Sequence, residues 1–428
     1  MDTIFALATA AGKAGVAVVR VSGSEAVSIC AKMGAVIGEH DRKLVRLLDA
    51  DGTLIDEAFV ISFAEGRSFT GEQVVELQCH GSPAITLALL RRLGELGLRL
   101  AEPGEFTRRA MENDMLDLAQ VEGLADLIDA ETESQRRQAV RVFNGALGDL
   151  ASVWRIKLVR AAALLEATID FVDEEVPIDV YPEVRDLVTA VAQEVAHEAA
   201  GVRVRERVRD GFEVALVGPP NSGKSTLLNR LAGRDAAIIS DIAGTTRDVI
   251  EVKMDLEGLP VTVLDTAGLR SSTDVLEEIG IERGKLRAQA ADVRVHLVDD
   301  PTVHEGDEGV GLDIWVQSKR DSRVDPAANG ISGLTGDGVD QLLDQISRYL
   351  SEQVAGAGTA TRTRHEQALS KANVALKDVL DGLLTNDTPV DFLAEDLRLA
   401  IRALDSLIGR VDVENVLGEI FSSFCIGK

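Results

Sequence analysis

The stretch GPPNSGKST, residues 218–226, constrains the fold of this chain more than any other feature of the sequence. It follows the apolar run FEVALV and opens the helical pattern TLLNRLAG, which is the strand–loop–helix context of a phosphate-binding loop. Its glycines let backbone N–H groups converge on phosphates, and the helix N-terminus adds positive potential. We expect Lys224 to reach the β- and γ-phosphate oxygens and Ser225 to bind Mg²⁺. The stretch therefore predicts a nucleoside triphosphate site.

Two motifs further along the chain fit the same kind of site. DTAG, residues 265–268, ends the apolar run VTVL, so we expect Asp265 to hold Mg²⁺ through water and the Gly268 amide to sense the γ-phosphate. Between the loop and this motif lies SDIAGTTRD, in which Thr246 is a candidate hydroxyl ligand for the metal. The order of the three motifs makes each of them stronger evidence than it is alone.

A fourth motif, SKRD at residues 318–321, points to the base. It follows the run DIWVQ, where guanine-binding proteins carry N-K-x-D. Asp321 can accept hydrogen bonds from the N1–H and N2–H₂ edge of guanine, which adenine does not offer, so we expect GTP rather than ATP. Ser318 replaces the usual Asn and shortens the side chain that would brace the loop and touch the base, which favours weaker nucleotide affinity. Ser332, in ISG, lies where the third base-contact loop is expected.

The chain lacks the glutamine with which many small GTPases orient the attacking water. Those proteins carry Gln directly after D-x-x-G, whereas this chain has Leu269, whose side chain cannot hydrogen-bond water. Spacing identifies no arginine of the chain that would stabilise the transition state. Acidic side chains beyond the motif can act instead, and Glu277 and Glu278 are the two candidates.

Hydrophobic periodicity predicts several domains. Residues 1–117 mix strand and helix patterns, as in a small α+β domain, and residues 118–210 have the period of long helices. Residues 211–350 alternate apolar strands with helices, which is typical of a parallel sheet covered on both faces. The stretch SEQVAGAGTA then predicts a short linker, and helical periodicity returns within residues 351–428. We expect a multidomain fold in which an α/β domain is inserted into one all-α helical domain.

Composition excludes several function classes. The 428 residues include 45 Lys and Arg against 71 Asp and Glu, a net charge of −26, which repels phosphate backbones and excludes a general nucleic-acid coat. The basic stretches, residues 203–210 with Arg136, Arg137 and Arg141, are expected to be solvated helix faces. Three dispersed cysteines argue against a zinc site, and the chain shows no secretory signal and no apolar run of about 18 residues. We therefore expect a cytoplasmic protein that does not enter a membrane.

Segments from one end of the chain to the other share one resemblance. They are DTIFALAT, GVAVVRVSG, SFTGEQVVELQCHG, RLAEPGEFTRRA, LDLAQVEGLADLIDAET, the phosphate loop, SDIAGTTRD, DTAGLR, GIERG and LGEIFSSFCIGK. In these segments the chain resembles the bacterial tRNA uridine 5-carboxymethylaminomethyl modification GTPases, the MnmE or TrmE family. The resemblance implies an N-terminal folate-binding and dimerising domain, a helical domain and an inserted Ras-like P-loop GTPase domain.

For the nucleotide site, the resemblance implies a K⁺ ion that supplies positive charge where other GTPases insert an arginine, in a site completed when two GTPase domains of a homodimer meet. It selects Glu277 as the residue that positions water, with Lys224 as the second catalytic residue. The implied K⁺ ligands are Asn221, Ser240, Ile242 and Thr245, and the Mg²⁺ ligands are Ser225 and Thr246. The full set of expected GTP contacts is Asn221, Ser222, Gly223, Lys224, Ser225, Thr226, Ser240, Asp241, Ile242, Ala243, Gly244, Thr245, Thr246, Asp265, Thr266, Ala267, Gly268, Ser318, Lys319, Asp321 and Ser332.

For the one-carbon donor, the resemblance implies a pocket for 5-formyl- or 5,10-methylene-tetrahydrofolate at Arg20, Glu76 and Lys428. A carboxylate suits the amide and amino edge of a pterin, and cations suit a glutamyl tail. Met115 stands where relatives carry Lys, which predicts a weaker hold on the folate tail. Cys425 is either a small buried hydrophobe or a participant in the chemistry, and the sequence leaves both open.

The resemblance also implies a partner of the MnmG family that carries FAD. The pair would attach an aminomethyl or carboxymethylaminomethyl group to carbon 5 of the wobble uridine of certain tRNAs, with tRNA held mostly by the partner. Two alternatives remain. A ribosome-assembly or signalling GTPase would share only the GTPase domain and predicts an RNA-binding appendage after it. A folate-binding module with a decayed GTPase domain is suggested by Ser318 and Met115.

Overall fold

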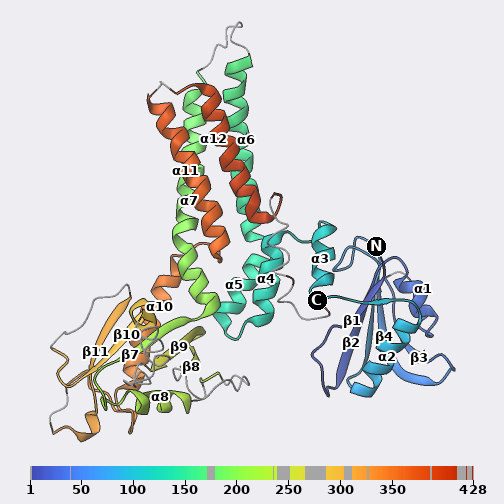
Figure 1. Cartoon of the computed structure of the whole chain (residues 1–428), viewed down its shortest axis with the longest axis horizontal. Helices are drawn as coiled ribbons and strands as arrows, with labels where there is room; N and C mark the ends of the chain where they lie inside the picture. The colour runs from blue at the N-terminus through green and yellow to red at the C-terminus, as the bar shows by residue number, and fades with distance from the viewer. Residues whose placement is uncertain are drawn as a thin grey trace, which may run out of the picture. The chain divides into compact units, whose positions relative to one another are not determined.

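The computed structural model describes most of the chain, and its described residues form two compact units (Figure 1). One unit is Met1–Ala125 with Asp405–Lys428, and the other is Asp126–Leu404. The described residues are 2–38, 40–170, 179–234, 236–238, 251–265, 286–302, 311–324, 327–385, 388–411, 421 and 427.

The first unit is built on a six-stranded sheet with the order β3-β4-β5-β2-β1-β6. The strands are β1 (Ile4–Leu7), β2 (Val16–Ser22), β3 (Arg42–Leu48), β4 (Leu54–Phe63), β5 (Val74–His80) and β6 (Arg99–Leu100). Only β1 and β6 are parallel neighbours among these strands. Helices α1 (Ala26–Ala31) and α2 (Pro83–Glu95) bury Ile29, Leu89 and Leu93 against one face. Alternate residues of each strand point away from that core.

The second face of this sheet carries the polar residues that the sequence singled out. Helix α3 (Glu105–Glu112) packs there through Phe106, which lies against Ile4 and Ala6 of β1. Arg20 of β2 and Glu76 of β5 are directly opposite each other in the antiparallel register. The sheet therefore presents a charged pair on the face that α3 covers. Helix α4 (Leu118–Asp129) then leads the chain from the first unit to the second.

Long helices form one part of the second unit. They are α5 (Glu133–Phe143), α6 (Ala146–Asp170), α7 (Tyr181–Asp210), α11 (Thr363–Thr385) and α12 (Val390–Asp405). Figure 1 shows α6, α7, α11 and α12 running side by side as a bundle. Buried Val184, Val188 and Val191 recur on α7 at the spacing of one helix face. Trp154 of α6 is fully buried and donates from Nε1 to Glu194 of α7 at 2.7 Å, so its one polar group is satisfied.

The chain leaves the bundle along α7 and returns to it where two glycines meet. A Cβ built on Gly201 of α7 would lie 2.6 Å from the backbone nitrogen of Gly358. A Cβ built on Gly358 would in turn lie 2.3 Å from a carboxylate oxygen of Glu198. Since real Cβ atoms do not approach backbone so closely, position 201 admits only glycine, and a Cβ at position 358 would displace the Glu198 carboxylate.

Two charged side chains of α7 fasten the returning segment at this crossing. The buried Glu198 carboxylate accepts hydrogen bonds from the backbone N–H groups of residues 359 and 360, at 2.5 and 3.1 Å. Arg205, two turns further along α7, donates to the carbonyl oxygens of residues 357 and 358, at 2.6 and 2.7 Å. We call these contacts, with the two glycines, the α7 clasp. The clasp holds the two connections of the inserted domain together.

The inserted domain contains a five-stranded sheet with the order β11-β10-β7-β9-β8. Its strands are β7 (Phe212–Val217), β8 (Glu251–Leu256), β9 (Leu259–Asp265), β10 (Val293–Val298) and β11 (Leu312–Gln317). The β8–β9 pair is antiparallel and the other pairs are parallel. Helices α8 (Lys224–Ala232) and α10 (Val339–Ala355) pack on one face. The helical residues 286–290 pack on the other face through Ala288.

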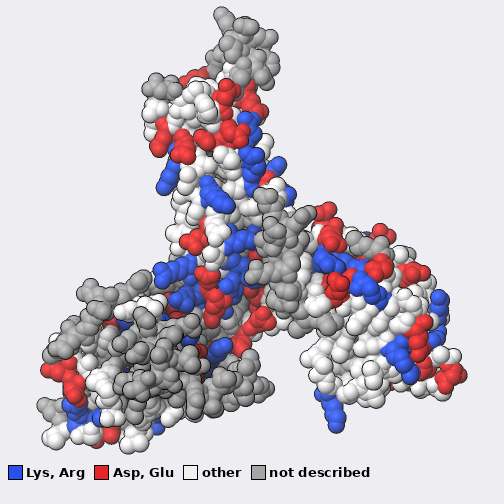
Figure 2. All heavy atoms as spheres, in the orientation of Figure 1, with Lys and Arg blue, Asp and Glu red and all other residues white. Residues whose placement is uncertain are grey.

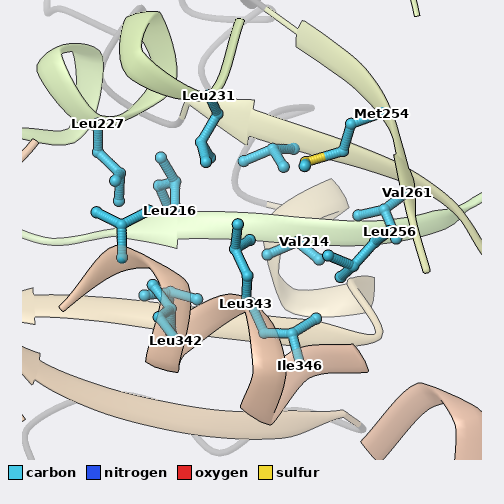
Figure 3. A pocket seen from close by; sticks show the side chains of 13 residues that line it. Val214, Leu216, Leu227, Leu231, Met254, Leu256, Val261, Leu342, Leu343 and Ile346 are labelled. Atoms are coloured by element: carbon cyan, nitrogen blue, oxygen red, sulfur yellow. The ribbon is translucent and has the colours of Figure 1, made fainter. Parts of the chain in front are cut away.

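The core beneath α8 and α10 fixes the start of α8 to the end of β7. Figure 3 shows aliphatic side chains from α8, β7, β8 and α10 converging, among them Leu227, Leu216, Met254 and Leu342. The gap that remains between them is about 10 Å³, and its lining offers water no polar partner. Such dense packing leaves α8 little freedom to move against β7.

Ion pairs join the inserted domain to the last turn of α7. Arg207 Nε lies 3.2 Å from Oδ1 of Asp292, and Oδ2 of Asp292 accepts the backbone N–H of Glu213 at 2.8 Å. Burial raises the pKa of Asp292, which Arg207 partly opposes. Arg287 pairs with Glu213 at 2.7 Å and also with Glu251 at the start of β8. Charged groups of both signs therefore alternate from α7 across one face of the sheet.

The predicted architecture is confirmed, with two differences in detail. The α+β domain, the all-α helices and the inserted α/β sheet are all present. Helix α10 continues to Ala355, so the first five residues of SEQVAGAGTA are helical and the predicted linker is too long. The sequence patterns did not indicate β8, whose antiparallel pairing puts it at the sheet edge.

The α7 clasp predicts an unusual response to a glycine substitution. Alanine is favoured over glycine inside a helix by about 1 kcal/mol, yet Gly201→Ala should destabilise the second unit by about 1–3 kcal/mol because its Cβ meets backbone. Calorimetric unfolding of the full chain measures the change. Gly94→Ala in α2 is the matched control, since its Cβ meets only Phe5 Cζ at 4.0 Å. A stabilising Gly201→Ala would contradict the close crossing.

Candidate functional site

The phosphate-binding loop lies between β7 and α8, as predicted, and its backbone requires special residues. Gly218, Asn221 and Gly223 have φ values of 153°, 63° and 99°. A Cβ on Gly218 would lie 2.5 Å from the carbonyl oxygen of Leu297 at the end of β10, so this position admits only glycine. Asn tolerates the left-handed region better than most side chains, which suits Asn221. The residues at these three positions therefore allow the backbone conformation of the loop.

Lys224, the first residue of α8, folds back over this loop. Its Nζ donates to the carbonyl oxygens of Gly218 and Pro219, at 2.8 and 2.9 Å, and lies 3.5 Å from Oγ of Ser222. The side chain is buried, and burial lowers the pKa of its ammonium group while the charge of Asp265 opposes the shift. A buried cation at a helix N-terminus is suited to an anionic ligand such as a phosphate.

Ser225 and Asp265 come together at the ends of β7 and β9. Ser225 Oγ donates to Oδ2 of Asp265 at 2.6 Å, and the Asp265 side chain is buried. A hydroxyl and a carboxylate are the hard oxygen ligands that Mg²⁺ prefers, directly or through water. The two residues that the sequence assigned to Mg²⁺ from separate motifs are thus neighbours in space.

The predicted base-binding loops lie at the same edge of the sheet. Ser318 follows β11 and donates its backbone N–H to Val298 at 2.9 Å, and Lys319 has a left-handed φ of 56°. Asp321, in the 3-10 turn η2 (Arg320–Ser322), is exposed. Ser332 is fully buried and its Oγ accepts the Thr335 N–H at 3.1 Å. Ligand sites of parallel α/β sheets lie at the carboxyl ends of the strands, where these loops are.

Several predicted site residues lie outside the described residues, and their roles stay predictions. They are Ser240, Asp241, Ile242, Ala243, Gly244, Thr245, Thr246, Thr266, Ala267, Gly268, Leu269, Glu277, Glu278, Cys425 and Lys428. Within the described part of the chain, Asn221, Ser222, Gly223, Lys224, Ser225, Thr226 and Asp265 are grouped at the phosphate loop, and Ser318, Lys319, Asp321 and Ser332 at the base loops.

In the first unit, the structure pairs the two predicted folate contacts that it describes. Arg20 Nε and Nη2 lie 3.0 and 2.9 Å from Oε1 of Glu76. The guanidinium carbon of Arg20 also lies 5.4 Å from the ring centre of Phe69 and 5.7 Å from that of Phe106. Both charged side chains are about one-fifth exposed, so the pair is accessible to a ligand. Charged groups beside flat rings suit a molecule with a polar aromatic ring.

The end of the chain lies close to this pair. A Cβ built on Gly427 would lie 2.1 Å from the carbonyl oxygen of Leu7, and Leu7 is paired with Val19, the neighbour of Arg20. Lys428 follows Gly427 directly in the sequence. The predicted grouping of Arg20 with the terminal lysine is therefore compatible with the position of Gly427.

A charged network beside Arg20 was missed by sequence reasoning. Arg109 is only 3% exposed, and its guanidinium contacts Glu72 at 3.1 Å, Glu105 at 3.0 Å and Asp2 at 2.9 Å. Ser22, two residues from Arg20, donates to Glu72 at 2.7 Å. The segments SFTGEQ and EFTRRA, which carried the resemblance, contain most of these residues, but no spacing rule assigned them a role.

Met115, the other departure from the family pattern, lies beside the same network. Its Cγ would be 3.1 Å from a Cβ on Gly71, and its side chain is 38% exposed. The expected weaker hold on a folate tail stays a prediction.

The prediction that the basic stretches are solvated is wrong in part. Figure 2 shows Lys and Arg side chains gathered over α5 and the lower half of α7. Arg205 and Arg207 of that patch are engaged in the α7 clasp and in the ion pair with Asp292. Arg136 and Arg137 each pair with Glu133 at 2.7 Å but are 53% and 75% exposed, as predicted. No helix among the described residues is long and apolar enough to cross a membrane.

The fold and the loops define a class of protein. A lysine folded over a glycine-containing loop, a Ser–Asp pair beside it and a guanine-type loop after β11 are the parts of a P-loop GTPase domain. Here the domain is inserted into a helical bundle that follows an α+β domain.

Comparisons with known proteins identify the family. The model described as MnmE helical domain matches residues 118–425, and the one described as GTP-binding protein TrmE N-terminus matches residues 3–115. The tRNA modification GTPases MnmE of Ruegeria pomeroyi and Dinoroseobacter shibae are 58% and 56% identical to the chain, over 100% of both sequences. Among solved structures, Aquifex aeolicus Era is 30% identical over 32% of this chain and 56% of its own, with a TM-score of 0.25.

The chain belongs to the MnmE family of tRNA modification GTPases. The predicted family and the predicted enzyme class, a GTP hydrolase acting in tRNA modification, are confirmed.

Replacing Lys224 should remove nucleotide binding while the fold remains. Lys224→Met keeps the length of the side chain and loses the ammonium group, so we expect GTP affinity to fall at least about 100-fold, the loss of one charged contact to phosphate. Titration with a fluorescent guanine nucleotide measures this affinity. Lys253→Met, on the exposed face of β8, is the matched control and should bind as wild type does. Equal affinity of both variants would show that Lys224 does not contact the nucleotide.

Proposed function

We propose that this chain is the potassium-dependent GTPase subunit of an enzyme that modifies carbon 5 of the wobble uridine in certain tRNAs to (carboxymethyl)aminomethyluridine. The one-carbon unit would come from 5-formyl- or 5,10-methylene-tetrahydrofolate. The observation that carries the proposal is that one chain combines a phosphate loop, at Lys224, and a guanine-type loop after β11 with a separate charged and aromatic site, at Arg20 and Glu76. A GTPase that shares only its nucleotide domain with this family has no need of the second site.

At the nucleotide site, Lys224 would hold the phosphates and Glu277 would orient the attacking water. Mg²⁺ and K⁺, when bound, supply positive charge to the β- and γ-phosphate oxygens. Ser225 and Asp265 have the oxygen chemistry and proximity that Mg²⁺ needs, with Thr246 as the further ligand. Asn221, exposed in the loop, would offer its amide oxygen to K⁺ together with Ser240, Ile242 and Thr245.

At the first unit, Glu76 would accept hydrogen bonds from the amide and amino edge of the pterin, and Arg20 would hold it in place. The rings of Phe69 and Phe106 near Arg20 support a flat aromatic ligand. Lys428 would meet the glutamyl tail, which the place of Gly427 against Leu7 makes reachable. Whether Cys425 takes part in the chemistry belongs to the same proposal.

The proposed partners and domain limits rest on the same resemblance to the MnmE family. We propose a homodimer in the cytoplasm, a flavin-dependent partner of the MnmG family that supplies FAD, and tRNA bound mostly by that partner. A chain with a net charge of −26, whose Arg205 and Arg207 are engaged internally, supports the last point. The proposed domains are 1–117, 118–210 with 351–428, and the inserted 211–350.

The wobble nucleoside tests the proposal directly. In a strain that lacks this protein, we expect mass analysis of total tRNA nucleosides to show loss of the (carboxymethyl)aminomethyl group and an unmodified carbon 5. Restoring the wild-type chain should bring the modification back, and the Lys224→Met variant should not. Unchanged nucleosides together with defective ribosome assembly would favour the alternative of a GTPase that shares only the nucleotide domain.

The choice of alkali ion tests the nucleotide part separately. GTP hydrolysis by the wild-type chain should be faster in K⁺ than in Na⁺, and Asn221→Ala should abolish the difference. Because alanine is strained at a φ of 63°, Asn221→Gly is needed as a second variant that removes the side chain without strain. Equal wild-type rates in both salts would exclude the K⁺ site, and absence of any guanine nucleotide binding would favour the folate-binding module.

A further inference from the structure

The side chain of Gln317 connects three segments around the predicted guanine site. Gln317 is the last residue of β11 and is only 9% exposed. Its Nε2 donates to the carbonyl oxygen of Asp299, beyond the end of β10, at 3.2 Å. Its Oε1 accepts the backbone N–H of Ala327 at 2.7 Å. Both ends of one buried amide are therefore used, one on each side of the SKRD loop.

The main chain of Gln317 extends this connection to the third base-contact loop. Its carbonyl oxygen accepts the N–H of Ile331 at 2.8 Å, and Ile331 directly precedes Ser332. A Cβ on Gly330 would lie 3.5 Å from Oε1 of Gln317, so the chain passes close over the amide. Gln317 thus contacts the segments on both sides of the SKRD loop through its side chain and the segment before Ser332 through its main chain.

The Ser318 side chain is poorly suited to bracing the SKRD loop against its neighbours. Its side chain is short and is buried directly after the strand. The hydrogen bonds that support the SKRD loop come from neighbouring arginines. Arg323 donates from Nε to the Ser318 carbonyl at 3.3 Å and pairs with Asp299. Arg320 donates its backbone N–H to Ile331 and its Nη1 to Gly330, at 3.0 and 3.1 Å. The loop is braced from both sides without an asparagine at 318.

We propose that Gln317 is the positioning residue for guanine recognition in this chain and does from the neighbouring position the bracing that the asparagine of N-K-x-D does elsewhere. It acts through Asp321 and Ser332, which it holds at the distance the base requires. The inference rests on the proposed role of these two residues as base contacts. A buried amide with both groups bonded is costly to remove, because the partner groups lose their hydrogen bonds together.

The test compares nucleotides that differ only at the edge of the base. Inosine diphosphate lacks the exocyclic amino group of guanosine diphosphate, so the ratio of the two dissociation constants reports on Asp321. With the full chain, Gln317→Leu should weaken GDP binding at least ten-fold and reduce the preference for GDP over IDP, while kcat at saturating GTP stays within two-fold. Gln345→Leu, an exposed glutamine on α10, is the matched control and should change neither constant.

Two further variants test whether the effect comes from the amide group of Gln317. Ser318→Asn added to Gln317→Leu should restore GDP affinity and preference toward the wild-type values. Gln317→Glu keeps an acceptor for Ala327 but puts an oxygen and a negative charge against the Asp299 carbonyl, so it should weaken GDP binding at least as much as Gln317→Leu does.

Three outcomes would overturn the proposal. They are an unchanged GDP affinity in Gln317→Leu, an equal weakening of GDP and IDP, and no recovery of GDP affinity when Ser318→Asn is added to Gln317→Leu. The second outcome would mean that Gln317 merely stabilises the domain. Loss of K⁺ stimulation or of tRNA modification in an otherwise active chain would count against the proposed function and not against the role of Gln317.

Discussion

The structure of the second unit depends on one close approach of backbone to backbone, at Gly201 and Gly358. A domain inserted into a helical bundle must leave and re-enter at neighbouring points, or the bundle would be pulled open. Here the re-entering segment lies on α7 itself, and Glu198 and Arg205 satisfy its backbone N–H and C=O groups. These polar groups are buried, so each would carry a desolvation cost if it were left unpaired. The crossing therefore combines a steric requirement for glycine with hydrogen bonds from Glu198 and Arg205 to the backbone of residues 357–360.

The inserted domain joins the last turn of α7 through ion pairs and through apolar packing, since Val208 of that turn is fully buried in the aliphatic core. Arg207 binds Asp292, and Arg287 links Glu213 to Glu251, so groups on one sheet face are connected to the last turn of α7. The aliphatic core lies on the opposite face, under α8 and α10 (Figure 3). The aliphatic core holds α8 and its Lys224 against β7 and includes Val208 of α7, while the other face carries the ion pairs to the last turn of α7.

Local patterns predicted the elements and the phosphate loop, because a strand, a glycine-containing loop and a helix follow one another in sequence. They could not predict the α7 clasp, since Glu198 and Gly358 are ordinary residues far apart in the chain. The role of Gln317 was hidden for a similar reason: the motif drew attention to Ser318, and only the fold shows which side chain reaches Asp299 and Ala327. Pairing of Arg20 with Glu76 came from family resemblance, while the buried Arg109 beside them followed from no spacing rule.

The meeting of Gly201 and Gly358 has a topological consequence. Where two backbones touch, the points at which the chain leaves and re-enters the bundle are neighbours, so the inserted domain spans only a short gap. The contacts of the α7 clasp therefore keep its two connections together.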